Sequence, residues 1–405
     1  MVNRAAPRLF NRPALLLATV ALAVVVAALA FHWWDRHVED RLGRWAVGEL
    51  ARRTDGTYRL FLGDLSFLPL DGTISFDSAI VATDSARNRR RETPLPALDW
   101  RAHGCRVFGL DLLRLVFRRS FVARGLECDR VIAGIALLSR PQEERRPTPD
   151  SAGAAAPVEK LVRPLGLSLF RIVDVSLPAL SLTLKRPGAR GGTSLLLEHA
   201  RFEAKDLVLD PTATPGERRS LSAERARLTA TGLVLRPDTL TEIAVAGVEA
   251  GLTDSTLRLT DARHEPSIPE DEWVRRVRVR RDRIRFELDS LQARGVAYRA
   301  FVATGDIRIR ALQLEGARLD VLTDKRMPRG RPSRHRIPQQ VAARPGPALR
   351  LDSVVVTGGT IVYREREPDR ERPGRVTFDS VRATVLDSTC RPGDSHSGYG
   401  RMLGS

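Results

Sequence analysis

The residue types that most often carry catalysis are scattered along this sequence. Its 405 residues include seven histidines, and the His-Glu-x-x-His spacing of zinc proteases does not occur. The glycine-rich motifs that bind nucleotide phosphates and the Gly-x-Ser-x-Gly turn of many hydrolases are also absent. The sequence therefore predicts a protein that is not an enzyme, with no metal site and no cofactor.

One short segment imitates a hydrolase motif. Ser395 and His396 are adjacent within residues 393–397, but no apolar segment follows them that would hold an oxyanion hole or a third catalytic residue. An exported hydrolase that used these two residues would lose its activity on deletion of residues 387–405. We consider that hypothesis only to exclude it.

The three cysteines leave two alternatives open. Cys105 and Cys128 would form a disulfide in an exported protein and leave Cys390 as the odd cysteine. Buried free thiols explain the same spacing equally well. A cysteine metal site is not expected, because neither Cys-x-x-Cys nor clustered histidine accompanies these residues.

Arginine dominates the charge of the chain. The formal net charge is +17, and only four of the 66 Lys and Arg residues are lysine, which a GC-rich genome produces without selection for phosphate binding. The densest basic cluster could contact anionic headgroups, but its many prolines favour a solvated loop. Its members are Arg326, Arg329, Arg331, Arg334, Arg336 and Arg344.

An apolar segment near the N-terminus predicts a transmembrane anchor over residues 13–34. Residues 14–31 carry no charge, and Trp33 and Trp34 follow at the position of a headgroup boundary. Three arginines within residues 1–12 keep this tip in the cytoplasm by the positive-inside rule. The alternative is a cleaved signal peptide with a small-x-small site at residues 28–30. Either alternative exports the rest of the chain and argues against nucleic acid as a partner.

The exported part has few helical patterns. Residues 37–54 place apolar side chains at helical spacing, and a second short helix is predicted over residues 111–117. Most other segments alternate apolar and polar residues, as short half-buried strands do. The alternation changes parity at intervals, which predicts bulges or tight turns. The linkers between these segments, such as residues 139–160 and 324–348, are rich in proline and arginine.

These alternating strands predict a mainly β fold with few short helices, in which one apolar face must be covered. The strands would form either closed sandwiches or an elongated, curled antiparallel sheet whose apolar groove holds lipid chains. The shortage of aromatic residues, at 5% of the chain, suits an aliphatic lining. The candidate lining residues are Leu180, Leu182, Leu184, Leu228, Leu233, Ile307, Ile309, Val354 and Val356.

The chain resembles the start of AsmA-like proteins in four consecutive features: an N-terminal apolar segment, an amphipathic helix with Gly56-Thr57-Tyr58, then FLGDLSFLPLDGTISFDSAIVATDSA, then PLPALDWRAHGCRVFGLDLLRLVFRRSFVARGLECDRVIAGIALL. The segment LRLDSVVVTGGTIVYRERE followed by RVTFDSVRATV resembles the repeat found deeper in such chains. The resemblance implies a repeating β-groove, anchored in the inner membrane of diderm bacteria, that carries phospholipid acyl chains across the periplasm or supports outer-membrane integrity.

These inferences divide the chain into six parts. They are a cytoplasmic tip (1–12), the anchor (13–34), an AsmA-like N-terminal region (35–138), a flexible linker (139–164), a β-repeat groove region (165–386) and a disordered tail (387–405), expected where the chain is truncated. The predicted protein is a single-pass inner-membrane protein with its bulk in the periplasm, and its partners are the membrane, phospholipid and other envelope proteins. The alternative is a structural or adaptor envelope protein with closed β-sandwich domains.

Overall fold

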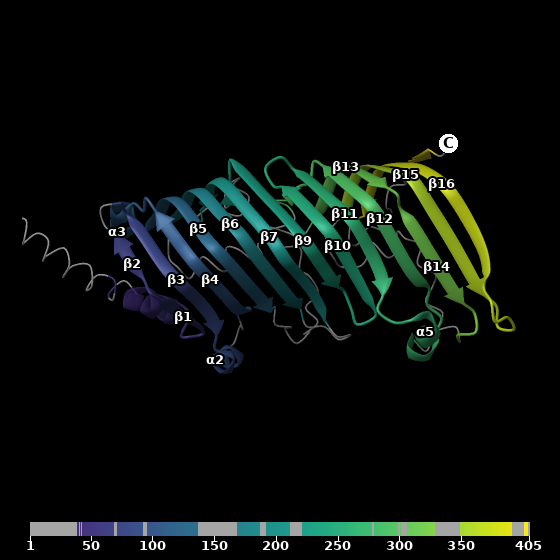
Figure 1. The fold of residues 1–405 in the computed structure, drawn as a ribbon, viewed down its shortest axis with the longest axis horizontal. Coiled ribbons are helices and arrows are strands. Elements are labelled where there is room, and N and C mark those ends of the chain that lie inside the picture. The colour runs from purple at the N-terminus through teal and green to yellow at the C-terminus, as the bar shows by residue number, and fades with distance from the viewer. Residues whose placement is uncertain are drawn as a thin grey trace, which may run out of the picture.

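The chain folds mainly as one long β-sheet, shown as a computed structural model in Figure 1. The structure describes residues 43–68, 71–91, 95–136, 168–186, 192–210, 221–277, 279–298, 306–328, 349–390 and 401–403, together with residues 39, 41 and 300. The predicted anchor and the loop residues 329–348 lie outside this part, as do Ser395 and His396. No helix among the described residues has the length and apolar content needed to cross a membrane.

Seventeen strands make up the sheet. The first seven are β1 (Tyr58–Gly63), β2 (Ser66–Leu68), β3 (Thr73–Thr83), β4 (Ala97–Phe108), β5 (Ser120–Ala136), β6 (Leu169–Arg186) and β7 (Thr193–Leu209). The middle ones are β8 (Leu221–Ser222), β9 (Arg225–Arg236), β10 (Thr241–Gly251), β11 (Thr256–Pro266) and β12 (Arg283–Arg294). The last are β13 (Ile307–Glu315), β14 (Arg318–Asp324), β15 (Leu349–Arg366), β16 (Gly374–Cys390) and β17 (Arg401–Leu403).

The strands pair almost in chain order, and the sheet is mixed. Antiparallel pairs run from β3 through β4 to β5, from β6 through β7, β9, β10 and β11 to β12, and from β15 to β16. Three pairs are parallel: β5 with β6, β13 with β15 and β14 with β15. The prediction of a purely antiparallel sheet is therefore wrong.

The parallel pairs explain the longest linkers. A strand that runs parallel to its predecessor needs a connection that returns along the whole strand, which takes a dozen or more residues. The chain between β5 and β6 is residues 137–168, and the chain between β14 and β15 is residues 325–348. Both coincide with proline- and arginine-rich linkers of the sequence, so the predicted linker is a crossover inside one sheet.

Many predicted short strands are halves of long strands. The apolar residues on either side of Gly232 belong to the single strand β9, and Gly232 itself has a positive φ of 72°. Glycine adopts this conformation without the steric penalty that other residues meet. Each such position bends the strand and changes its alternation, so the predicted parity changes correspond here to an irregularity inside a strand.

Helices are few and lie at the borders of the sheet. The first helix covers residues 43–53 in the described part, and α2 (Ser85–Arg90) and α3 (Leu112–Arg118) follow. The prediction of a helix at 111–117 is confirmed to within a residue, since the Asp111 side chain caps α3 by accepting from the Arg114 amide at 3.0 Å. Helix α5 (Glu270–Val277) was not predicted.

The end of the chain differs from the predicted tail. Strand β16 continues to Cys390, and β17 pairs with it through Arg401–Leu403. Two segments of the region expected to be disordered therefore belong to the sheet. Because β16 is paired with β15 along its length, its ladder of backbone hydrogen bonds extends the strand past the end of the apolar pattern.

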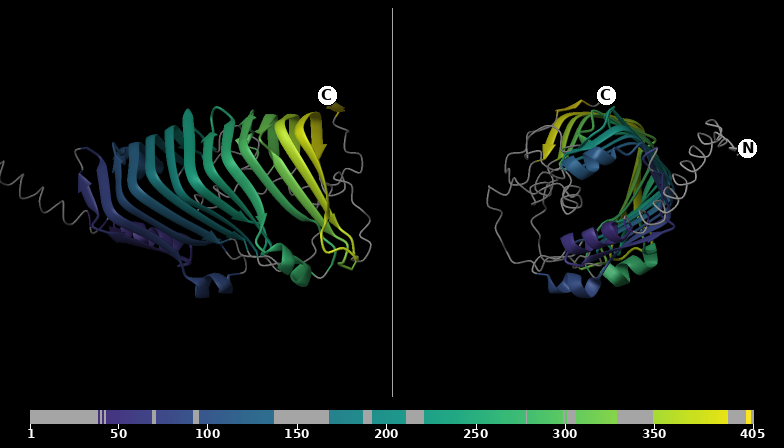
Figure 2. Two further views of the ribbon diagram at one scale, coloured as in Figure 1. Left: turned by 45° about the vertical axis from the view of Figure 1, so that its right-hand side comes forward. Right: turned by 90° about the vertical axis from the view of Figure 1, so that its left-hand side faces the viewer.

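Seen end-on, the sheet curls into a C-shaped outline (Figure 2). The β5–β6 pairing joins the predicted N-terminal region to the predicted repeat region without a break. The closed sandwiches of the alternative prediction need two sheets packed face to face, whereas the described strands form a single sheet. That alternative architecture is therefore wrong for this part of the chain.

Candidate functional site

A continuous row of apolar residues crosses the sheet, and we call it the first apolar row. Each member lies directly opposite the next on the adjacent strand, so all of them point to the same face. The row comprises Leu62, Ala79, Ala102, Val131, Leu180, Ala200, Ala230, Val248, Leu259, Leu291, Leu314, Val356 and Ala383. Twelve interstrand steps of about 4.8 Å make the row about 58 Å long.

A second apolar row runs beside the first on the same face. Its members are Leu60, Val81, Trp100, Ala133, Leu182, Leu197, Leu233, Val245, Ala262 and Leu288. The two rows share a face because, for example, Ala79 and Val81 are two residues apart on one strand. The face that they share is called the apolar face below.

The apolar face is well packed and lies on the inner side of the curl. Leu197, Ala200, Ala230, Val245 and Val248 are each at most 6% exposed and form one cluster. Helix α3 packs Leu112 and Leu115 against a neighbouring cluster of this face, and the helix lies inside the C-shaped outline (Figure 2). The apolar face is therefore the concave one.

Seven of the nine predicted lining residues belong to the apolar face. Leu180 and Val356 lie in the first row, and Leu182 and Leu233 in the second. Leu228, Val354 and Leu184 occupy neighbouring positions, which are paired with Ala250, Leu312 and Leu195 respectively.

The other two predicted lining residues are on β13. Ile307 and Ile309 lie opposite Leu349 and Leu351 of β15, and Ile307 is 38% exposed. The pairing of β13 with β15 is interrupted between Ile309 and Ala311. The alternation that places Leu312 on the apolar face therefore does not extend to Ile307 and Ile309.

Small residues of the apolar face were left out of the predicted lining. Ala102, Ala200 and Ala230 are 0%, 3% and 6% exposed and sit at the centre of the first row. Alanine favours helices and is depleted in strands, so an alanine between polar residues gives only a weak strand signal. Their two-residue spacing from larger apolar residues, as between Leu228 and Ala230, was the signal that would have found them.

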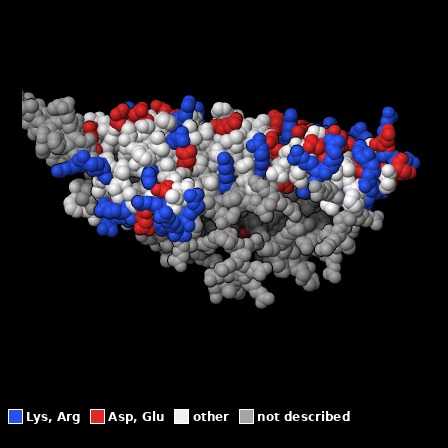
Figure 3. All heavy atoms as spheres, turned by 90° about the horizontal axis from the view of Figure 1, so that it is seen from below, with Lys and Arg blue, Asp and Glu red and all other residues white. Residues whose placement is uncertain are grey.

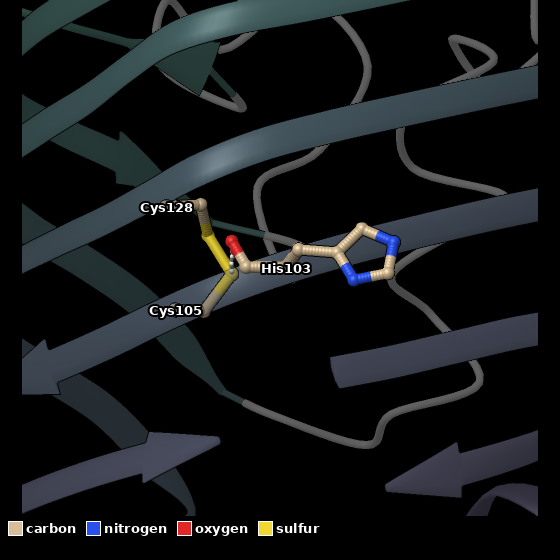
Figure 4. Close-up of a disulfide and its surroundings, with 3 residues drawn as sticks. All are labelled: His103, Cys105 and Cys128. Carbon is tan, nitrogen blue, oxygen red and sulfur yellow. Dashed lines mark hydrogen bonds between the residues drawn. A yellow bond between two sulfur atoms is a disulfide. The ribbon is translucent and has the colours of Figure 1, made fainter. Parts of the chain in front are cut away.

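A disulfide crosses two strands beside the first row. Cys105 of β4 lies opposite Cys128 of β5, and their sulfur atoms are bonded. Figure 4 shows the bond between the two strands, with the imidazole of His103 extending away from it. The cysteines are 1% and 4% exposed and pack with Ala102 and Val131. Of the two alternatives that the sequence left open, the disulfide is the one found.

The opposite face of the sheet is polar. Seen from below, basic and acidic side chains are interspersed along the described surface (Figure 3). A hollow of about 700 Å³ lies between β5 and β11. Its lining includes three residues of the first apolar row together with five charged ones, Arg130, Glu198, Arg201, Glu249 and Arg258. Its charges are of both signs, so it does not select for an anion or a cation. We therefore place the candidate site on the apolar face.

One residue of the predicted basic cluster falls in the described part. The guanidinium of Arg326 donates to both carboxylate oxygens of Asp324, at 3.0 and 2.7 Å, and the Asp324 side chain is only 3% exposed. Burial opposes ionisation of Asp324, but hydrogen bonds from Arg326 and the charges of Arg326 and Arg366 outweigh it and lower the pKa of this carboxyl. Arg326 therefore stabilises a buried carboxylate, while Arg329, Arg331, Arg334 and Arg336 lie outside the described residues.

This arrangement can bind apolar molecules on the apolar face of the sheet. In the ranges that the structure describes, no three His, Cys, Asp or Glu side chains gather closely enough to hold a metal ion. The apolar face offers methyl and methylene groups over a length of about 58 Å, and such a surface attracts hydrocarbon without directional bonds.

No protein-family model matches the chain, and no curated protein matches it. A solved structure described as "Crystal structure of Sex pheromone staph-cAM373 precursor" aligns with 91% of this chain and 92% of its own chain. The sequence identity is 5% and the TM-score is 0.12, which carries no argument about fold or function.

Proposed function

We propose that this protein is an AsmA-like, membrane-anchored protein whose concave apolar face forms a groove for phospholipid acyl chains. In this proposal the protein has no catalytic role and contributes to phospholipid transport or to biogenesis of the outer membrane. The anchor at residues 13–34 holds it in the inner membrane, with the N-terminus in the cytoplasm and the bulk in the periplasm. Phospholipid and other envelope proteins are its partners.

The observation that carries the proposal is the first apolar row, which has an apolar residue on each of thirteen strands joined by twelve consecutive pairings. A single sheet must cover such a face with helices, with a second sheet or with another apolar body. Acyl chains have the shape and chemistry to fill a long aliphatic channel.

The length of the row suits chains laid end to end. One leaflet of a bilayer has a hydrocarbon depth of about 15 Å, half of the usual core thickness of about 30 Å. A row about 58 Å long therefore exceeds the length that a single acyl chain needs. A face that accepts hydrocarbon everywhere along its length allows a chain to slide, because no position holds it by directional bonds.

The first test is the lipid content of the purified full-length chain. The protein would be extracted in detergent, delipidated in a parallel sample, and both analysed by mass spectrometry for phospholipid. We expect co-purified phospholipid in the first sample and rebinding of added phospholipid by the second. A folded protein that carries no acyl chains and rebinds none would contradict the proposal.

The second test locates the lipid on one face. Phospholipid with a diazirine in its acyl chain would be cross-linked to the protein, and labelled peptides mapped by mass spectrometry. Labelling should concentrate on residues of the apolar face and should decrease in an Ala230→Glu variant, which puts a charge in the first row. The matched control is Thr231→Glu, one residue along β9 and exposed on the other face, which should label like the wild type. Equal labelling of both faces would reject a groove.

A further inference from the structure

Helix α3 carries the two most exposed large apolar side chains of the described part of the chain. Leu113 is 71% exposed and Phe117 is 79% exposed, and residues four apart lie on the same side of a helix. On the other side, Leu112 and Leu115 pack against the apolar face of the sheet. A helix that is apolar on opposite sides is typical of an environment without water on either side.

The position of α3 is at one end of the row of strands, where the chain leaves its N-terminal segment (Figure 1). The amide of Leu110, just before α3, donates to the carbonyl oxygen of Gly72 at 2.9 Å. Gly72 follows β2, and the amide of Phe67 in β2 donates to the Glu39 carboxylate at 2.9 Å. Glu39, β2 and α3 are therefore neighbours at this end.

The N-terminal apolar segment must be close to this end. Residues 14–31 end eight residues before Glu39, and eight residues span at most about 29 Å when fully extended. A membrane that holds the predicted anchor therefore has its surface within that distance of Glu39, which contacts β2 at the same end of the sheet as α3. The far end of the sheet, at β16, is about twice as far along the first row.

Basic residues flank the exposed apolar pair. Arg118 and Arg119 are exposed beside Phe117, and Arg114 pairs with Asp111 at 3.1 Å while remaining half exposed. Apolar side chains next to arginine are the pattern of segments that lie in the interface of an anionic bilayer, with rings among the acyl chains and guanidinium groups among the headgroups.

We infer that α3 docks into the surface of an anionic phospholipid bilayer, with Leu113 and Phe117 inserted and Arg118 and Arg119 at the headgroups. The inner side of the same helix contacts the apolar face, so docking places the end of the apolar rows against the leaflet. The role of this docking rests on the proposed function: acyl chains would pass between the bilayer and the sheet at the docked helix.

The test places a fluorescent amino acid at single positions of the full-length chain, reconstituted in vesicles of phosphatidylethanolamine and phosphatidylglycerol with brominated acyl chains. Bromine quenches only a fluorophore that reaches the hydrocarbon. We expect at least fivefold stronger quenching at positions 113 and 117 than at positions 376 and 378. Val376 and Phe378 are the matched controls, because they are 53% and 56% exposed at the far end of the sheet.

Charge variants and lipid analysis complete the test. Arg118→Gln with Arg119→Gln should reduce quenching at position 117 at least twofold, whereas variants of two distant exposed arginines, Arg370→Gln with Arg372→Gln, should not change it. Equal or absent quenching at all four positions would overturn the docking, as would cross-linking of α3 to a second copy of the chain. The phospholipid content of the same samples is measured separately, so bound lipid without quenching refutes the docking alone, and quenching without bound lipid refutes the groove alone.

Discussion

Two helices at the borders of the sheet have opposite characters. At the N-terminal end, α3 leaves Leu113 and Phe117 in solvent and is flanked by a disulfide-linked pair of strands. At the lower border of the sheet (Figure 1), α5 buries Trp273 to 3% exposure against Ile268 and Met327. A helix that hides its large apolar residues serves the fold, and a helix that exposes them is available for a partner.

Ion pairs hold α5 in place. The Glu270 carboxylate accepts from the guanidinium groups of Arg364 and Arg366 at 3.0 and 2.7 Å, and both arginines belong to β15. Arg366 also pairs with Asp324, so the network ties the helix to β14 and β15. The comparison teaches that ion pairs and a buried aromatic ring fix α5 to the strands beside it, whereas α3 lies next to a covalent cross-link and leaves two large apolar side chains exposed.

The largest expected effect is the loss of Trp273. Trp273→Ala should lower the free energy of unfolding by about 3–5 kcal/mol, because it empties a buried site and leaves the carbonyl of Arg281 without its indole partner. Urea unfolding followed by circular dichroism in detergent measures this. Trp45→Ala is the control, since Trp45 is 56% exposed and should change stability by less than about 0.5 kcal/mol. Equal effects would remove the contrast between the helices.

The disulfide gives the next effect. Cys105→Ala with Cys128→Ala should lower the free energy of unfolding by about 3 kcal/mol, because the cross-link closes a loop across a sequence separation of 23 residues in the unfolded chain. A reductant should weaken the wild type by a similar amount and leave the double variant unchanged. If the reductant weakens both proteins equally, the cross-link does not hold this end.

The ion-pair network around α5 is tested by two glutamates on this helix. Glu270→Ala should cost about 2 kcal/mol, because it removes one of the two carboxylate partners of each of two arginines that are 19% and 13% exposed. Glu272→Ala removes a carboxylate that pairs only with the exposed Arg276 at 3.1 Å, and should cost less than about 0.5 kcal/mol. Similar losses in the two variants would show that the network does not stabilise α5.

A smaller effect is expected on acidification. Because the pKa of Asp324 is lowered in the folded state, its carboxylate stabilises the fold above its unfolded pKa of about 3.9, and this stabilisation is lost as the pH falls through the lowered value. The wild type should thus be more stable than Asp324→Asn at pH 7, and the difference should shrink toward pH 3. A difference that stays constant with pH would show that ionisation of Asp324 is not involved.

The smallest effect on stability is expected at α3. Leu113→Ser with Phe117→Ser should change the free energy of unfolding by less than about 0.5 kcal/mol, since these side chains are exposed. Leu115→Ser, on the inner side of the same helix, should cost about 2 kcal/mol or more. If replacing Leu113 and Phe117 lowers the free energy of unfolding as much as replacing Leu115 does, the exposed side of α3 stabilises the fold, and the contrast with α5 is lost.

Much of the fold was predictable from local patterns. Alternation at Leu180, Leu182 and Leu184 predicted a strand with one apolar face, and the helical spacing of apolar residues within 111–117 predicted α3. Helix α5 was missed because its first turn is acidic and only Trp273 is buried, so its apolar stripe is too narrow to give a helical signal. The parallel pairs were missed because a long linker between two strands looks the same in sequence whether it crosses over or simply protrudes.

The sequence by itself determined the local features: which segments are strands, which side of each strand is apolar, and where the short helix α3 begins. These depend on residues within a few positions of one another. The tertiary structure decided that all strands join one sheet, that Cys105 meets Cys128, and that alanines far apart in sequence align with larger residues into one row. Register across strands is set by packing between distant segments, so the continuous apolar face exists only after folding.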